Sequence, residues 1–511
     1  MTFRSILFQN GSDASVIRAE APPDFFRDLN LDRVVDAIIS GREEYDLRPF
    51  FYCLLDSVDE IAYRHEVMRD LHSEGLADSI RRFSQLMRQA RGHRASCEAS
   101  RYPYQRERLF LHSVESYCAA CESLLDDLDR LEPASRGLIG FREFLRGYVS
   151  SESFSGLVRE ATGLAADLSR IRYGMLVGNS SITVSAFQGD DDFGSSVEAL
   201  LGNLSSGTGR EYLPDYQPAS GMSHIDAEVL KLVARLNPRV FQHLLEFCGN
   251  HGGFAESIVT DFDREIQLYL GWLEHAGTLR RSGLEFCFPE MTRCRTGIFC
   301  RNGFDMALAA KLMRENKSMI CNDFALSPGE RIMVVTGPNQ GGKTTFARAF
   351  GQILYLARLG FPVPGEEARL FLFDRLFTHF ARLEDIRNLH GRLEDDLFRT
   401  RRILDHATGS SVIIMNEAFS STALGDAVHL SREILGRISR LDAICVWVTF
   451  IDTLADFDSK TVSMVAGVDS GDSTIRTYRI ERRQADGVSY ALALAGRHGL
   501  TREAIVRRLS G

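Results

Sequence analysis

The stretch Gly337-Pro-Asn-Gln-Gly-Gly-Lys-Thr-Thr345 decides the fold of the second half of this chain. It fits the pattern G-x-x-x-x-G-K-[ST], follows the apolar run 332–336 and precedes a helical pattern that begins near Thr345. Glycines let the backbone wrap a phosphate and aim N–H groups at it, and a helix N-terminus adds partial positive charge. A chance match or a structural glycine turn explains the loop alone, but not the strand, lysine and helix together. We therefore predict a phosphate-binding loop.

The residue types in this loop point to ATP with Mg²⁺. Lys343 is placed to reach the β- and γ-phosphates, and the hydroxyl of Thr344 can ligand Mg²⁺. We expect every residue of the loop to contact the nucleotide. These residues are Gly337, Pro338, Asn339, Gln340, Gly341, Gly342, Lys343, Thr344 and Thr345.

A second apolar run, Val412-Ile-Ile-Met415, ends in Asn416-Glu417, at the position of a Walker B strand. Glu417 is placed to orient or polarise an attacking water, which makes it the candidate catalytic residue. The residue that helps to hold Mg²⁺ through water is expected to be aspartate. Asn416 keeps an oxygen acceptor there and lacks the charge. The alternative is that Glu417 only caps a loop.

Composition is that of a globular protein with several domains. The 511 residues predict about three to four domains at ~150 residues each. Hydrophobic residues make up 44% and charged residues 25%, which excludes general disorder, collagen and a coiled coil alone.

The charge is uneven along the chain. Residues 1–300 carry a net charge of −12 and residues 301–511 carry +3. A basic footprint over a whole domain, the usual sign of nucleic-acid binding, is therefore absent. Any contact with DNA would come from local arginines, and one run lies around the long helix predicted at 104–131. Its members are Arg88, Arg91, Arg94, Arg101, Arg106 and Arg108. The alternative for this run is an ordinary solvated face.

The sequence shows no targeting or membrane segment. Residues 1–11 lack the apolar region of a signal peptide, and no apolar run approaches the ~18 residues of a membrane span. We therefore expect a cytoplasmic protein with reduced thiols and no membrane partner. Cys118 and Cys121 form a C-x-x-C on an apolar helical stripe, which favours a place in the core over a zinc or redox site.

Patterning divides the chain into a helical part, 1–280, and an α/β part, 281–511. Helical patterns cover about 30–91, 104–131, 155–172, 223–248 and 253–275. A β-type alternation at 180–187 interrupts them. The second part alternates helical segments with short apolar runs at 331–336, 412–415, 443–449 and 474–480, which predicts a mostly parallel sheet.

Several motifs in order resemble the ATPase domain of the MutS family. The resemblance covers 327–507. It rests on the stretches Thr336–Thr345, Asp374-Arg-Leu-Phe-Thr378, Ile403-Leu-Asp-His-Ala-Thr408, Val412–Glu417 and the tail Gly487–Ala495. More weakly, Arg48–Leu55 and Tyr63-Arg-His-Glu-Val67 resemble the segment that packs the core in that family.

This resemblance implies a multidomain fold. A helical core and lever domain (1–280), with a short clamp-like insertion at 173–222, would precede a P-loop ATPase domain of ABC type (281–511). It also implies a homodimer in which the loop Phe419-Ser-Ser-Thr422 completes the partner's nucleotide site, and in which ATP opens and closes the lever arms.

Departures from the family pattern suggest a divergent paralogue. The chain begins at the core, so we expect no mismatch-reading domain and no connector. No serine occurs in Glu384–Arg399, where the family has one that acts across the dimer. Thr449-Phe450 stands where the family has Thr-His, and Asn416 replaces the usual aspartate. These changes suggest ATP binding with slow hydrolysis.

Two functions follow from these patterns. The first is a dimeric, ATP-dependent DNA-binding protein of MutS type that engages non-standard or branched duplex DNA in repair or recombination. The second is an ATP-gated structural dimer that holds a protein partner and binds little or no DNA. The net charge of residues 1–300 favours the second, and the resemblance favours the first.

Overall fold

The computed structural model describes residues 3–9, 21–177, 181–187, 222–295, 297–381, 391–469, 475–485, 498 and 500–509. The chain divides into two compact units. Unit 1 comprises Met1–Phe3, Leu71–Ala134 and Leu138–Asp263, and unit 2 comprises Arg4–Asp70, Ser135–Gly137 and Arg264–Gly511. The chain is thus multidomain, with helices and mixed sheets. Among the described residues, no helix is both long and apolar enough to cross a membrane.

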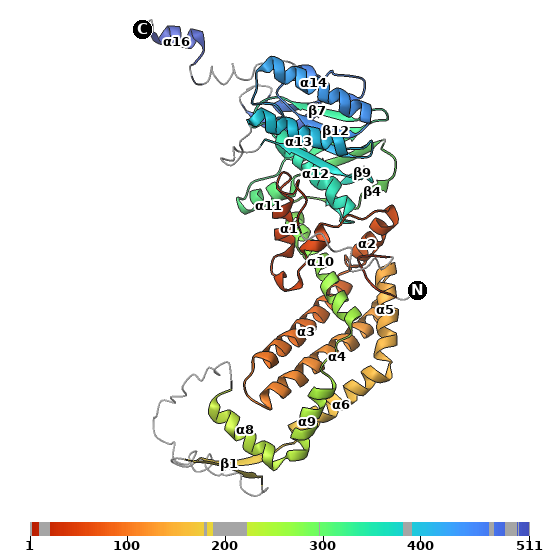
Figure 1. Cartoon of the computed structure of the whole chain (residues 1–511), viewed down its shortest axis with the longest axis vertical. Coiled ribbons are helices and arrows are strands. Elements are labelled where there is room, and N and C mark those ends of the chain that lie inside the picture. The colour runs from red at the N-terminus through yellow and green to blue at the C-terminus, as the bar shows by residue number, and fades with distance from the viewer. Residues whose placement is uncertain are drawn as a thin grey trace. The chain divides into compact units, whose positions relative to one another are not determined.

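Unit 1 is mainly helical. Its elements are α3 (Glu74–Ala99), α4 (Gln105–Leu131), most of α5 (Arg136–Val149), α6 (Glu152–Ser169), the hairpin β1 (Tyr173–Val177) and β2 (Ile182–Ala186), α8 (His224–Leu236), α9 (Pro238–Asn250) and the start of α10 (Ser257–Arg280). The long helices α3 and α4 lie side by side (Figure 1). Both helices carry buried apolar side chains at helical spacing, among them Phe83, Phe110 and Val114.

The predicted helix at 223–248 is in fact two helices. Ser223 caps α8, because its hydroxyl accepts the backbone N–H of Asp226 over 3.1 Å. Pro238 begins α9, and proline at the first helical position needs no N–H donor but cannot continue the preceding helix. The continuous periodicity of the sequence hid this break.

Cys118 and Cys121 lie in the core of α4, as predicted. Both are buried, and burial raises the pKa of Cys118 to about 12. No cluster of three or more metal-ligating side chains occurs in the part of the chain that the structure describes.

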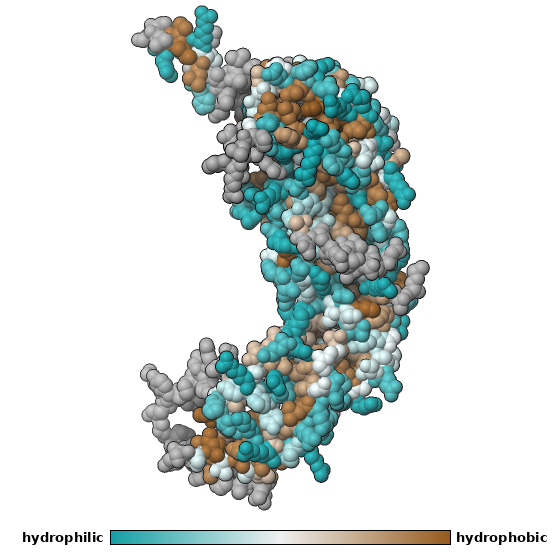
Figure 2. Space-filling view, in the orientation of Figure 1, coloured by the Kyte–Doolittle hydropathy of each residue, from teal (hydrophilic) through white to brown (hydrophobic). Residues whose placement is uncertain are grey.

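The β-type alternation near 180–187 is confirmed as the second strand of the hairpin β1–β2. Large apolar side chains on β1 are exposed there, with Met175 at 53% and Leu176 at 74%. Figure 2 shows hydrophobic side chains gathered where β1 lies. Most of the clamp-like insertion predicted at 173–222 lies outside the described residues.

The N-terminal segment of unit 2 packs with the rest of that unit. It contains α1 (Leu31–Ile39), the short helices η2 (Glu43–Tyr45) and η3 (Arg48–Phe51), and α2 (Val58–Asp70). Phe50 and Phe51 are fully buried, and Phe51 stacks on Phe361. Arg64 is 1% exposed and donates to the carbonyls of Leu7 and Leu359 over 3.0 and 2.8 Å. The division of the chain at 280/281 into a lever domain and an ATPase domain stays a prediction.

A six-stranded sheet forms the centre of unit 2. Its order is β10-β11-β12-β7-β13-β14, with only β14 antiparallel to its neighbour. The strands are β7 (Ile332–Thr336), β10 (Leu376–Phe380), β11 (Val412–Asn416), β12 (Ile444–Val448), β13 (Thr461–Val468) and β14 (Arg476–Arg482). β7, β11 and β12 are buried along their whole length, which explains their continuous apolar runs.

Helices cover both faces of this sheet (Figure 1). α12 (Lys343–Arg358) packs on one face, against β11 and β12. α13 (Arg392–His406) and α14 (Leu424–Leu441) pack on the other, where their apolar side chains join Met415 and Trp447 in one core.

Smaller elements complete unit 2. A second sheet has the order β4-β9-β5-β6, and a further pair joins β3 to β8. The bounds are β3 (Phe286–Cys287), β4 (Glu290–Thr292), β5 (Ile298–Gly303), β6 (Asn322–Leu326), β8 (Val363–Pro364) and β9 (Glu367–Phe371), with α11 (Met306–Arg314), η4 (Asp452–Leu454) and α16 (Arg502–Leu509).

Candidate functional site

The loop 337–342 leaves the carboxyl end of β7, between β12 and β13, and leads directly into α12. Three of its residues have left-handed backbone angles: Gly337 (φ 109°), Gln340 (φ 60°) and Gly342 (φ 95°). Glycine adopts such angles without steric cost, so the two outer glycines fit their positions. The loop therefore curls over the N-terminus of α12 and aims that end of the helix into the space it surrounds.

Two glycines of the loop leave no room for a side chain. A Cβ on Gly337 would lie 3.0 Å from the backbone N and O of Ala466 on β13. A Cβ on Gly341 would lie 2.9 Å from the carbonyl oxygen of Pro338. The loop thus rests against a neighbouring strand, which holds its backbone in the cradle that a phosphate requires.

Lys343 is buried at the first position of α12. Its ammonium donates to the carbonyl oxygens of Gly337 and Pro338 over 2.8 and 3.0 Å, and lies 3.5 Å from Oδ1 of Asn339. Burial lowers the pKa of Lys343, whereas the carboxylate of Glu417 acts in the opposite direction. The ammonium therefore points back into the loop, at the place where a bound phosphate would sit.

Thr344 and Asn416 meet across 72 residues of sequence. The hydroxyl of Thr344 donates to Oδ1 of Asn416 over 2.9 Å. Asn416 is the last residue of β11, and β11 is two strands from β7 in the sheet. Parallel strands bring their carboxyl ends to one edge of a sheet, so the two sequence motifs meet there.

Glu417 follows β11 in a left-handed conformation, with φ 53°. Its backbone N–H donates to the carbonyl of Val448 over 2.9 Å, which fixes the turn after the strand. The negative charge of Glu417 raises the pKa of Lys343, against the effect of burial, so the two side chains belong to one charged cluster.

Two residues near the site were not found by sequence reasoning. Nε of Arg476 on β14 donates to the carbonyl of Asn339 over 3.3 Å. The negative charge of Asp452 in η4 raises the pKa of Lys343, against the effect of burial. Neither belongs to a motif. Both residues reach the carboxyl edge of the sheet through the positions of their strand and loop in the fold. No spacing in the sequence predicts those positions.

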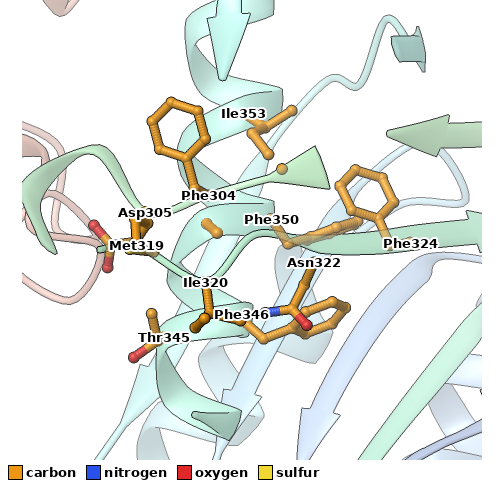
Figure 3. Close-up of a pocket in the computed structure, with 12 residues that line it drawn as sticks. Phe304, Asp305, Met319, Ile320, Asn322, Phe324, Thr345, Phe346, Phe350 and Ile353 are labelled. Carbon is orange, nitrogen blue, oxygen red and sulfur yellow. The ribbon is translucent and has the colours of Figure 1, made fainter. Parts of the chain in front are cut away.

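An apolar pocket lies beside the first turn of α12 (Figure 3). Thr345 and Phe346 of that helix line it, together with Phe304, Ile320 and Asp305 from the segment around α11. Its volume is about 10 Å³, which is the room of about one water molecule, so it is a packing gap and not a site for a nucleotide base.

The structure describes only some of the other segments in which the sequence departs from or resembles the family pattern. Thr449 is buried and its N–H donates to Val335 O over 3.0 Å, while Phe450 is 47% exposed. The first part of the stretch Glu384–Arg399, where a cross-dimer serine is expected, lies outside the described residues at 384–390, as does the tail 487–495.

The arginine run of unit 1 is largely paired with carboxylates. The ion pairs are Arg91 with Asp263, Arg94 with Glu98, Arg106 with Glu107 and Arg108 with Glu115. Pairing reduces the positive potential that this face offers to phosphate groups.

Comparison with known proteins bears on this geometry. The family model described as MutS domain V matches residues 333–509. DNA mismatch repair protein MutS of Chlorobium phaeovibrioides (strain DSM 265 / 1930) is 27% identical over 280 residues, 53% of this chain. The MutS proteins of Rickettsia bellii (strain OSU 85-389) and Orientia tsutsugamushi (strain Ikeda) are 31% and 29% identical over 201 and 222 residues, 38% and 42% of this chain. The chain is a MutS-family protein.

The MutS relatives are matched only in part. The alignments cover 31%, 22% and 25% of the Chlorobium, Rickettsia and Orientia proteins, so the chain matches less than a third of their length. The region matched to MutS domain V begins inside β7 and contains the phosphate loop, Asn416 and Glu417. The predicted divergence of this chain from other members agrees with these identities.

Proposed function

We propose that this protein is a dimeric ATPase of MutS type whose ATP state controls its engagement of non-standard or branched duplex DNA in repair or recombination. The observation that carries the ATP site is the hydrogen bond between Thr344 and Asn416 beside the buried ammonium of Lys343. It joins the two motifs that an ATP site requires, the phosphate loop after β7 and the end of β11, two strands away.

The residues at the site fit a nucleotide. Loop residues 337–342 supply backbone N–H groups and the space of absent side chains, and the N-terminus of α12 adds partial positive charge. Lys343 would exchange its contacts with the loop carbonyls for contacts with the β- and γ-phosphates.

Mg²⁺ would be held by Thr344 directly and by Asn416 through water. Both side chains present oxygens at one point, which suits a hard cation. When bound, the ion neutralises charge on the phosphates. Glu417 would orient the attacking water and accept its proton, since it directly follows Asn416 and its charge acts on Lys343.

A second protomer would complete each site. The loop after Glu417 turns at Phe419, which is buried with φ 61°, and this turn leaves Ser420 and Ser421 exposed. Leu424 and Phe450 add apolar surface near the same edge, at 62% and 47% exposure. Light scattering should therefore give about twice the chain mass of 57.3 kDa. A monomer both with and without ATP would contradict the dimer.

The DNA function is tested by filter binding with a panel of linear, mismatched and branched duplexes, with and without ATP. We expect branched or non-standard forms to bind more tightly than linear duplex. Affinity should fall as salt rises, because phosphate contacts release counterions.

The second candidate is an ATP-gated dimer that holds a protein partner. The observation in its favour is the pairing of the arginine run of unit 1 with carboxylates. Equal and very weak binding of every DNA form at low salt would favour this candidate, provided that ATP still binds.

A further inference from the structure

A second pocket in unit 2 lies away from the phosphate loop. It has a volume of about 360 Å³ and lies between α1, α10 and α11. α1 packs against α11, and Figure 1 shows these two helices side by side. None of the residues that line it belongs to the loop 337–345. This volume is within the range of small-molecule sites.

Basic side chains converge on this pocket from helices far apart in sequence. Arg33 comes from α1, and Lys311 and Arg314 come from α11. Glu315 is the one carboxylate among the residues that line it. The carboxylate of Glu315 lies 3.9 Å from Nζ of Lys311 and 2.7 Å from Nζ of Lys317, and Lys317 does not line the pocket. Most of its charge is therefore matched by Lys317, and the pocket keeps an excess of positive charge in a chain whose net charge is −9.

Two of these cations have no carboxylate partner among the described residues. Arg33 makes no ion pair there, and Nε of Arg314 donates only to the backbone carbonyl of Ala310, over 3.1 Å. Four arginines of the run in unit 1, by contrast, pair with carboxylates. Unpaired guanidinium groups that face one concave space are suited to bidentate contacts with an oxyanion.

His275 on α10 adds a neutral donor to the pocket. Its Nε2 atom is buried and has no hydrogen-bond partner within the part of the chain that the structure describes. Burial lowers the pKa of His275, so at neutral pH the ring is uncharged and carries one N–H. An anion oxygen in the pocket would satisfy a polar atom that otherwise lacks a partner.

We propose that this pocket binds a small phosphate-bearing anion, separately from the ATP site. Arg33, Lys311 and Arg314 would hold the phosphate oxygens, and His275 would donate one neutral hydrogen bond. Three cations against one carboxylate favour a dianion over a monoanion. A concave site of this size takes a small molecule or its terminal phosphate rather than the side of a duplex.

The site also has a structural path to the nucleotide pocket. Asp305 caps the N-terminus of α11, where its Oδ1 accepts the N–H of Leu308 over 3.1 Å. The same oxygen accepts from Gln352 on α12 over 2.8 Å, and Asp305 lines the apolar pocket of Figure 3. Lys311 and Arg314 thus lie on the helix whose capping residue, Asp305, is bonded to α12, the helix that begins at Lys343.

The test is calorimetric titration with pyrophosphate in a Lys343→Ala background, which removes the phosphate loop as a binding site. We expect one saturable site to remain. Adding Arg314→Gln or Arg33→Gln should each weaken it about tenfold, the usual scale of a charge-assisted contact. The matched control is Arg281→Gln, because Arg281 is exposed, lies outside the pocket and, among the described residues, bonds only to Thr278. It should leave the affinity unchanged.

Three outcomes would overturn the proposal. One is no saturable binding in the Lys343→Ala background, and another is an equal loss in the Arg281→Gln control. The third is equal or tighter binding of citrate, which would assign the site to carboxylates, or of a short duplex that displaces pyrophosphate, which would assign it to nucleic acid. Fluorescence of the buried Trp272 and Trp447, both in unit 2, verifies that each variant is folded.

Discussion

The hydroxyl of Thr344 donates a hydrogen bond to Oδ1 of Asn416 over 2.9 Å, at the edge of the sheet where the phosphate loop begins. The bond uses the oxygen of the amide and the proton of the hydroxyl. An aspartate at position 416 would offer an oxygen at the same place, so the substitution keeps this bond and adds one negative charge. The substitution Asn416→Asp therefore tests the effect of the added charge while the hydrogen bond to Thr344 is kept.

Asn416→Asp should lower the Mg²⁺ concentration needed for hydrolysis, or raise turnover at low Mg²⁺. A carboxylate near the metal attracts the cation that the phosphates recruit. The measurement is steady-state phosphate release against Mg²⁺ concentration for both proteins. A higher Mg²⁺ requirement would instead indicate that the new carboxylate and Glu417 repel each other and that one of them takes up a proton.

Glu417→Gln should stop hydrolysis and leave ATP binding in place. A water-orienting carboxylate acts mainly at the transition state, and loss of such a base costs about 10²–10⁴-fold in rate. Glutamine keeps the size of the side chain, so the left-handed turn at φ 53° need not change. Phosphate release and affinity for a labelled ATP analogue are measured on one preparation. Equal rates in the variant and the parent would remove Glu417 from its catalytic role.

Lys343→Ala should abolish measurable ATP binding, because the β- and γ-phosphates lose their nearest point charge. The carbonyls of Gly337 and Pro338 lose their donor as well, so the empty loop should also loosen. Lys317→Ala is the matched control, since this lysine is exposed and pairs with Glu315. Binding of a labelled ATP analogue by the Lys343 variant, with the affinity of the control, would contradict the assignment.

The sequence predicted the elements around this site because local patterns specify them. A buried parallel strand reads as a continuous apolar run, so β7, β11 and β12 were found. The loop was found because glycine, lysine and threonine occur at a fixed spacing. The contact between Thr344 and Asn416 was foreseen only as two motifs, since nothing local in the sequence gives a distance across 72 residues.

Other contacts of the site depend on the order of the strands in the sheet, which cannot be predicted from local sequence patterns. Arg476 reaches Asn339 because β14 pairs with β13 at the edge of the sheet, and Ala466 supports Gly337 because β13 lies beside β7. The placement of residues 4–70 in unit 2 likewise depends on contacts between segments that are distant in the sequence. Phe51 contacts Phe361 through tertiary packing of segments some 300 residues apart. Sequence periodicity does not predict contacts between segments so far apart.

His65→Gln should remove part of the loss of stability that unit 2 shows in acid. His65 is 4% exposed and packs edge-on against Phe288. Burial lowers its pKa to about 4, below the ordinary value near 6.5, and the nearby charge of Arg69 acts in the same direction. The unfolded chain therefore binds a proton between these two values that the folded unit does not. The stabilisation is fully present above pH 6.5 and is lost as the pH falls toward 4.

At pH 5 this difference amounts to about 2 kcal/mol of unfolding free energy. Urea unfolding at pH 7 and pH 5, followed by tryptophan fluorescence, measures it in unit 2, because Trp272 and Trp447 both lie there and are the chain's two tryptophans. The wild-type protein should lose more stability between these two pH values than His65→Gln. His429→Gln, at an exposed histidine of the same unit, should behave as the wild type does. If His65→Gln and the wild type lose stability equally, protonation of His65 does not drive the acid sensitivity of this unit, and other buried groups must account for it.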